Sequence, residues 1–323
     1  MGDYGRPNGK KGAFDHYARL WMESVSLRLK DSSCVKYRNV IDRRLLPALG
    51  SFRIDKIDLE TVQRFLQELV APQRGRALSG STIKTVVSTL RRILDFARVD
   101  LDLPPLAYKN LLPIANGRSA NVDILTKTEV QRLLCYLTER YQENLALVGV
   151  YLPIVTGMRI GEVCGLQWGD VDFAANSLII TRTVRRLQTF SSKGPRTAVR
   201  ISTPKTQSSR RTVPLSQKTR SLLASIRVDR PTAFVLTGTE KPLEPRTLEN
   251  VFRRVLAECG IRRVRFHDLR HFFATLYVTS GFDVKSLSEI LGHSSVNITL
   301  DIYSHSSNEL KIRYLDALDR KLS

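Results

Sequence analysis

Four polar side chains between His267 and Tyr303 are of types that can act on a phosphate group. His267 and Arg270 lie in H-D-L-R-H, His293 lies in L-G-H-S-S, and Tyr303 follows ten positions later. Guanidinium and imidazole groups bind phosphate oxygens, and a phenol can attack phosphorus once cations or a base overcome its pKa of about 10. His267 and His271 also have the spacing of a helical zinc site, so this segment alone leaves both interpretations open.

Two cations farther upstream favour the phosphate interpretation. Arg159 lies in T-G-M-R-I-G-E, with Glu162 at a spacing that permits an ion pair. Lys205 lies in P-K-T-Q-S-S-R, a polar turn expected between two strands. Each cation could also be purely structural, Arg159 as the ion-pair partner of Glu162 and Lys205 as a solvated lysine in a turn. A zinc protease, however, would leave both without a role, and Asp268 stands where its glutamate is expected.

The composition indicates a globular protein with a polyanionic partner. The 323 residues suffice for two domains, and the hydrophobic fraction of 42% allows each domain a core. Lys and Arg number 51 against 31 Asp and Glu, and the resulting net charge of +20 favours nucleic acid as the partner. The 4 cysteines are expected to be reduced, buried thiols. The sequence has neither a signal peptide nor a membrane-spanning run, so we expect a cytoplasmic, nucleoid-associated protein.

We expect residues 12–100 to form a helical domain that follows a flexible N-terminus at residues 1–11. Apolar residues recur at helical spacing in four segments joined by short connections. Residues suited to N-caps precede three of these helices: Asp31 or the two serines after it, Asp58, and Ser79 or Ser81. Pro47 and Gly50 are expected to end the second helix.

Residues 101–122 contain three prolines and are expected to link this domain to a second one at residues 123–323. Thr126 and Glu129 have the spacing of a capping box at the start of its first helix. Further helices are expected at about 144–155, 162–166 and 245–260, and strands at 177–181, 198–202 and 211–215. Residues 182–196 could be an extended hairpin or a flexible loop. The last residues, which include Leu310, Leu315 and Leu318, predict a short amphipathic helix.

Basic side chains on the polar faces of the N-terminal helices could contact phosphates. The set consists of Lys36, Arg38, Arg43, Arg44, Lys84, Arg91 and Arg92. Such residues also keep a protein soluble, and the sequence does not decide between the two roles. With the overall positive charge, phosphate contact is an expectation for several of them.

The motifs T-G-M-R-I-G-E, P-K-T-Q-S-S-R-R-T-V-P-L, H-D-L-R-H and L-G-H-S-S, with the tyrosine after them, resemble those of the tyrosine recombinases, the phage integrase family. The residues of these motifs are most similar to those of the integrases of phages and conjugative transposons. The resemblance implies a mainly α-helical fold with a small antiparallel sheet. It implies a four-helix core-binding domain that contacts DNA and an α+β catalytic domain from about Val122 onward. The implied activity is site-specific cutting and rejoining of DNA, for integration or excision of a mobile element.

The resemblance also implies the course of the reaction. Tyr303 would attack the scissile phosphodiester and leave a 3′-phosphotyrosine with a free 5′-hydroxyl. Arg159 and Arg270 would bind the non-bridging oxygens, where negative charge builds up. Lys205 would protonate the leaving 5′-oxygen.

Three further residues would support this chemistry. His267 would take part in acid–base or hydrogen-bonding work near the tyrosine, His293 would donate to a phosphate oxygen, and Glu162 would orient Arg159 or an adjoining histidine. Because the cations of the site supply the positive charge that metal ions supply elsewhere, no metal or other cofactor is expected.

The partners that the resemblance implies are double-stranded DNA at specific sites and a homotetramer on two duplexes. The C-terminal helix would dock on a neighbouring subunit or pack on its own domain. Excision proteins or host architectural proteins are further candidates, and no membrane is expected. A type IB topoisomerase and a DNA-binding protein without catalysis are the rival interpretations. Many integrases carry an arm-binding domain ahead of the core-binding helices, so this chain is either a simple recombinase or a fragment.

Overall fold

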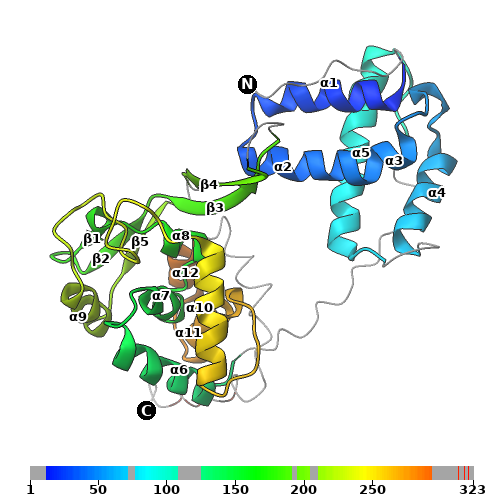
Figure 1. Ribbon diagram of the computed structural model, residues 1–323. Helices are drawn as coiled ribbons and strands as arrows, with labels where there is room; N and C mark the ends of the chain where they lie inside the picture. The colour runs from blue at the N-terminus through cyan, green and yellow to red at the C-terminus, as the bar shows by residue number, and fades with distance from the viewer. Residues whose placement is uncertain are drawn as a thin grey trace. The chain divides into compact units, whose positions relative to one another are not determined.

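The computed structural model describes residues 12–71, 77–107, 125–190, 195–203 and 210–292, together with Ile312, Asp316 and Asp319 (Figure 1). The chain divides into two compact units. Unit 1 comprises Met1–Asn121 with Leu187–Ala198, and unit 2 comprises Val122–Arg186 with Val199–Ser323. The domain boundaries expected from the sequence stay predictions, since a compact unit need not coincide with a domain that folds alone.

Helices are the main elements in the described part of unit 1. Its elements are α1 (Phe14–Ser26), α2 (Asp31–Val40), the π-helical η1 (Ile41–Leu45), α3 (Leu46–Leu49), the 3-10 helix η2 (Ile54–Lys56), α4 (Leu59–Val70) and α5 (Gly80–Asp100). The predicted caps are confirmed for α4 and α5. Asp58 accepts a hydrogen bond from the backbone N–H of Thr61 at 2.8 Å, and Ser79 accepts one from Thr82 at 3.3 Å.

The second helix departs from its predicted start and end. Lys30 is the N-cap and makes no side-chain capping bond, so the expected cap at Asp31, Ser32 or Ser33 is wrong. Asp31 instead lies in the first turn, where its carboxylate favours the positive end of the helix dipole. Pro47 does not end the helix, because it lies at the start of α3, where its missing N–H costs little. Gly50 is the C-cap of α3.

The core of unit 1 is made by the apolar faces of α1, α5 and the segments between them. The side chains of Phe14, Tyr17, Leu45, Leu90 and Ile93 are buried there. The Tyr17 hydroxyl donates to Asp100 at 2.7 Å, which fixes the end of α5 to α1. Burial, together with this carboxylate, raises the pKa of Tyr17 to about 12.

Unit 2 packs helices around the buried helix α7 and carries a small sheet. Its helices are α6 (Lys127–Arg140), α7 (Ala146–Thr156), α8 (Ile160–Cys164), the 3-10 helix η4 (Trp168–Asp170), α9 (Gln217–Ser225), α10 (Pro245–Glu258), α11 (His267–Thr279) and α12 (Val284–Leu291). Figure 1 shows α6, α10 and α11 gathered about α7, and contacts join each of the three to it. Almost all residues of α7 are buried, because helices cover it on several sides.

The sheet of unit 2 is antiparallel and runs in the order β1 (Val171–Asp172), β2 (Ser177–Ile180), β5 (Arg211–Pro214). Leu178 and Ile180 of β2 are buried whereas Ile179 is exposed, the alternation of a strand with one covered face. The register pairs Ile180 with Arg211. Arg211 therefore begins β5 next to the protein interior.

Three findings extend or correct the predicted elements of the second half. Residues 182–196 include β3 (Thr183–Gln188), which pairs with β4 (Thr197–Ser202), so their described part is the hairpin alternative. The helix α9, capped by Ser216, was not expected, because its short length leaves little periodic signal. In the tail, Ile312, Asp316 and Asp319 are helical, while Leu310, Leu315 and Leu318 lie outside the described residues.

The cysteines differ from one another in exposure. Cys164 is buried, Cys34 and Cys259 are half-buried, and Cys135 is exposed. The prediction of buried thiols is therefore wrong for Cys135, which lies on the solvent side of α6 with its sulfur 3.0 Å from a carboxylate oxygen of Glu139. In the part of the chain that the structure describes, no helix has the length and hydropathy needed to cross a membrane.

Candidate functional site

Arg159 lies at the junction of α7 and α8, where a glycine turn redirects the chain. Gly157 is the C-cap of α7 and has φ +67°, a left-handed conformation that favours glycine. Two residues later, Arg159 is the N-cap of α8. Its backbone N–H donates to Oε2 of Glu162 at 2.9 Å, and its Nη1 donates to Oε1 at 2.8 Å. The ion pair expected from the sequence is therefore present, and 35% of the Arg159 side chain stays exposed.

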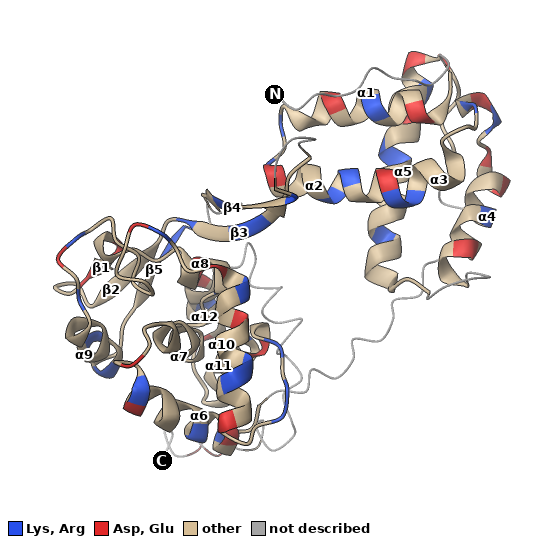
Figure 2. Ribbon diagram, in the orientation of Figure 1, with Lys and Arg blue, Asp and Glu red and all other residues tan. Residues whose placement is uncertain are grey.

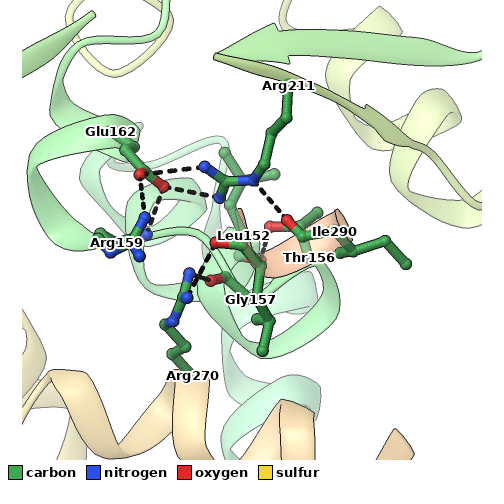
Figure 3. Close-up of polar contacts among 9 residues, drawn as sticks. Leu152, Thr156, Gly157, Arg159, Glu162, Arg211, Arg270 and Ile290 are labelled. Atoms are coloured by element: carbon green, nitrogen blue, oxygen red, sulfur yellow. Dashed lines mark hydrogen bonds and ion pairs between the residues drawn. The ribbon is translucent and has the colours of Figure 1, made fainter. Parts of the chain in front are cut away.

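Glu162 is shared with a second arginine, Arg211, which the sequence analysis did not single out (Figure 3). Nη1 and Nη2 of Arg211 donate to Oε1 and Oε2 of Glu162 at 3.1 and 2.9 Å, a two-pronged contact. Both side chains are only 5% exposed. A signal existed in the sequence, because alternation along β5 places Arg211 on the same inward face as the buried Val213.

The shared carboxylate of Glu162 is held in its charged form. Burial by itself would raise the pKa of Glu162. The hydrogen bonds and charge of Arg211, with the charge of Arg159, outweigh burial and lower the pKa to about 2. Glu162 is therefore ionised at neutral pH despite its burial.

Arg270 is buried within unit 2 and holds two helix ends together. It lies on α11 with 3% of its surface exposed. Its Nη1 donates to the backbone carbonyl of Gly157 at 2.7 Å, and its Nη2 donates to that of Leu291 at 2.9 Å. These carbonyls belong to the carboxyl ends of α7 and α12, which carry partial negative charge. Arg270 thus fixes the turn that leads to Arg159.

The histidines of H-D-L-R-H lie on one face of the first turns of α11. The rings of His267 and His271 meet edge to face with centroids 4.7 Å apart. Burial, with the charges of His271, Arg270 and Arg159, lowers the pKa of His267 to about 4, against the opposing effect of Asp268. Burial also lowers the pKa of His271. Both rings are therefore neutral at pH 7 in the protein without a bound anion.

Asp268 is engaged within its own helix start and with Arg265. Its carboxylate accepts from the backbone N–H of Arg265 at 2.7 Å and from Nη2 of that residue at 2.8 Å. Among the described residues, no group of three His, Cys, Asp or Glu side chains is placed to hold a metal ion.

Three of the predicted site residues lie outside the described residues, namely Lys205, His293 and Tyr303. The described neighbours of the first two are placed as follows. Arg211 begins β5, six positions after Lys205. Gly292 is the C-cap of α12 in the left-handed conformation, with φ 64°. The structure brings Arg159, Glu162, His267 and Arg270 into one region of unit 2. Arg159 pairs with Glu162, and the charges of Arg159 and Arg270 both lower the pKa of His267.

The basic residues predicted to contact DNA lie on helices of unit 1. Figure 2 shows Lys and Arg along α2 and α5. Lys36, Arg43, Arg44 and Lys84 are exposed. Arg91 pairs with Asp95 at 3.6 Å, Arg92 donates to the Tyr37 hydroxyl at 2.7 Å, and Arg38 stacks on the Phe190 ring at 4.1 Å. Their contact with DNA stays a prediction.

The comparisons with known proteins cover both units. The phage integrase family matches residues 123–309, and the phage integrase N-terminal SAM-like domain matches residues 13–70. A tyrosine recombinase XerC-like protein of Caldanaerobacter subterraneus subsp. tengcongensis is 27% identical over 93% of this chain and 81% of its own length.

Two solved structures resemble the fold of the chain. The Tn1549 transposon integrase in complex with transposon right end DNA is 20% identical, with a TM-score of 0.73 over 94% of this chain and 99% of its own. The lambda integrase tetramer bound to a Holliday junction is 16% identical, with a TM-score of 0.63 over 94% of this chain and 82% of its own. The predicted fold class, mainly α with small antiparallel sheets, is thereby confirmed.

Proposed function

Because the chain belongs to the phage integrase family and is a site-specific tyrosine recombinase, we propose which of its residues cut and rejoin DNA. Tyr303 gives its phenol proton to a base, a role in which His267 can take part, and its phenolate oxygen attacks the scissile phosphorus. The bond between phosphorus and the 5′-oxygen breaks, and Lys205 gives that oxygen its proton. The products are a 3′-phosphotyrosine and a 5′-hydroxyl. A 5′-hydroxyl of a partner strand reverses the step, so no energy source is consumed.

Arg159 and Arg270 hold the non-bridging oxygens while this step takes place. The main support for this proposal is that hydrogen bonds hold both guanidinium groups in place before a phosphate binds. Arg159 is tied to Glu162 and keeps part of its side chain exposed, and Arg270 is tied to the carbonyl two residues before Arg159. Charges that are already oriented stabilise a transition state without the cost of reorganisation.

His267 and His293 complete the proposed site. His267 is neutral before DNA binds because its surroundings lower its pKa. It takes part in acid–base or hydrogen-bonding work near the tyrosine once a phosphate brings negative charge beside it. His293, which follows the turn at Gly292, donates to a phosphate oxygen. The SAM-like match at residues 13–70 supports a recombinase over a topoisomerase, because it extends the likeness to the N-terminal unit.

The assembly that we propose is a homotetramer on two DNA duplexes, and the lambda integrase tetramer bound to a Holliday junction supports this proposal. DNA is contacted by basic residues of unit 1 as well as by the site. The tail helix docks on a neighbouring subunit, and excision or host architectural proteins assist at the nucleoid. A variant that ends at Ser307 should no longer form the tetramer on DNA. The mass of the protein–DNA complex, measured by gel filtration, would show this loss.

The test of the proposed function is covalent capture on a suicide DNA. The DNA is a nicked duplex that carries an end of the mobile element, so that cleavage releases a short strand and cannot be reversed. Wild-type protein should give a protease-sensitive DNA adduct, and Tyr303→Phe should give none. Tyr277→Phe, which removes a hydroxyl from α11, is the matched control and should still give the adduct. An adduct formed by Tyr303→Phe would refute the proposed nucleophile.

A further inference from the structure

Arg211 joins three parts of unit 2 that come from distant places in the sequence. From the start of β5, its Nη atoms hold both oxygens of Glu162 on α8. Its Nε donates to the backbone carbonyl of Ile290 near the end of α12. Arg270 holds the next carbonyl, that of Leu291, and also the carbonyl of Gly157. Figure 3 shows the contacts of Arg211 with Glu162 and Ile290 and that of Arg270 with Gly157.

The contacts form a closed circuit that contains both arginines of the proposed phosphate clamp. The circuit runs from Arg159 to Glu162, then through Arg211 to the end of α12, and through Arg270 back to Gly157, two residues before Arg159. A closed circuit of buried and half-buried contacts fixes the distance between its members better than separate pairs do. Arg211 is the link between the Arg159 side and the α12 side.

Charge gives Arg211 a second effect. Glu162 carries one negative charge and lies next to two guanidiniums, so the cluster of Arg159, Glu162 and Arg211 has one net positive charge. If Arg211 were absent, Glu162 would neutralise Arg159 and draw its guanidinium inward, since a buried carboxylate needs a close partner. With Arg211 present, Glu162 can orient Arg159 without cancelling the charge that a phosphate would meet.

We propose that Arg211 is a positioning residue for DNA cleavage, which holds Glu162 and the end of α12 so that Arg159 and Arg270 keep the spacing and charge needed to clamp one phosphate. The inference rests on the proposed function. It assigns Arg211 no contact with DNA, and its effect belongs to the chemical step. A misplacement of a catalytic group by about 1 Å can lower a rate by about 10²-fold.

The test measures single-turnover cleavage of the suicide DNA with excess protein, separating the rate constant from the final amount of adduct. Arg211→Met should lower the rate constant by about 10²-fold with little change in DNA affinity or final adduct. Arg211→Lys keeps the charge but not the two-pronged contact, and its rate should lie between those of Arg211→Met and wild type.

A double variant keeps the test decisive if Arg211→Met fails to fold. Glu162→Gln together with Arg211→Met leaves no unpaired buried carboxylate, so it should fold. Both changes break the same circuit, so the rate constant of the double variant should be no lower than that of the slower single variant. If Arg211→Met does not fold, the comparison is with Glu162→Gln. A double variant whose loss is the product of the two single losses would overturn the inference. Where Arg211→Met does not fold, a double variant far slower than Glu162→Gln would overturn it.

The control is Arg182→Met, which removes the arginine partner of a buried carboxylate in the same unit. Arg182 pairs with Asp170, whose side chain is 8% exposed, outside the circuit. It should reduce stability and the amount of adduct but not the rate constant. If Arg211→Met also lowers only the amount, or if the two variants slow cleavage equally, Arg211 is merely structural and the inference is refuted. Absence of any adduct from wild type would instead refute the proposed function, and with it the inference.

Discussion

Glu162 is the residue on which the charge of the site depends. Each of its oxygens accepts two hydrogen bonds, from the backbone and side chain of Arg159 and from Arg211. Removing one partner of such a buried group leaves the other partners with an unmatched charge, which costs more than the pair contributes on its own. Glu162 should therefore be sensitive both to substitution and to pH.

The stability that Glu162 contributes should disappear in acid. Its pKa is about 2 in the folded protein and 4.5 as the ordinary value, so the unfolded chain takes up a proton first as pH falls. The contribution is complete above about pH 4.5 and is lost as pH falls toward about 2. The free energy of unfolding of wild type should exceed that of Glu162→Gln by about 3 kcal/mol at neutral pH, and the difference should shrink in this window.

Urea unfolding at pH values from about 6 to about 3.5 would measure this difference. Trp168 lies in unit 2 and Trp21 in unit 1, so a Trp21→Phe background lets fluorescence report on unit 2 alone. Glu244→Gln is the control, because Glu244 pairs with Arg186 and both side chains are more than a third exposed. That variant should cost at most about 1 kcal/mol. A difference for Glu162→Gln that does not change with pH would contradict the prediction.

At this scale the sequence predicted local pairs but not the long-range one. The spacing of Arg159 and Glu162 was enough to predict their ion pair, since residues three apart on a helix face each other. Arg211 lies 49 positions from Glu162, and only the folded register of β5 brings it there. The sequence-based interpretation of Glu162, as a residue that orients Arg159 or an adjoining histidine, was therefore incomplete.

Turns and caps position the site at the scale of elements. The capping box of Thr126 and Glu129, which the sequence predicted, is confirmed, and the left-handed Gly292 is a second local device. Gly157 has a further role that its neighbours in sequence do not reveal. A Cβ at this position would lie 2.6 Å from Cδ2 of Leu291 and 2.7 Å from Cδ1 of Phe273. The turn is thus close to both α11 and α12.

Gly157→Ala should destabilise unit 2 through two separable effects. The left-handed backbone with φ +67° costs a non-glycine residue about 1–2 kcal/mol. The close approach to Leu291 and Phe273 should add about 1–3 kcal/mol by overpacking. Gly238→Ala isolates the first effect, because its φ is +64° and its nearest neighbour, Cγ2 of Val228, is 3.7 Å away. Equal losses in urea unfolding for the two variants would show that packing at Gly157 is unimportant.

Elements without a strong local signal escaped prediction. The helical run from α2 to α3 continues past Pro47 because the π-helical η1 sets the proline at the start of a new helix. No periodicity or cap in the sequence marks that change. The short α9 was missed for a related reason. Its 9 residues make only about two helical turns, too few for a clear apolar period. Buried packing in the tertiary structure, rather than local preference, decides both segments.

At the scale of the whole molecule, the net charge of +20 acts together with where the charges lie. A uniform excess would attract DNA without orienting it, whereas phosphate contacts at fixed places set the register. Unit 1 offers exposed basic residues on neighbouring turns, among them Arg43 and Arg44 of η1. Unit 2 offers a comparable pair, Arg253 and Arg254 of α10, but these lie within 4 Å of Glu249 and Glu258.

The salt dependence of DNA binding should distinguish placed charges from total charge. For 6–10 phosphate contacts, affinity should fall by about 10³–10⁵-fold between 50 and 200 mM salt. Replacing Arg43 and Arg44 with alanine should lower the slope of log K against log salt by about 2, because each lost phosphate contact removes about 0.9. The matched variant with Arg253 and Arg254 replaced loses the same charge but should keep the slope. Equal changes in the two variants, measured by fluorescence anisotropy on a duplex carrying the element's end, would mean that unit 1 contributes charge without specific phosphate contacts.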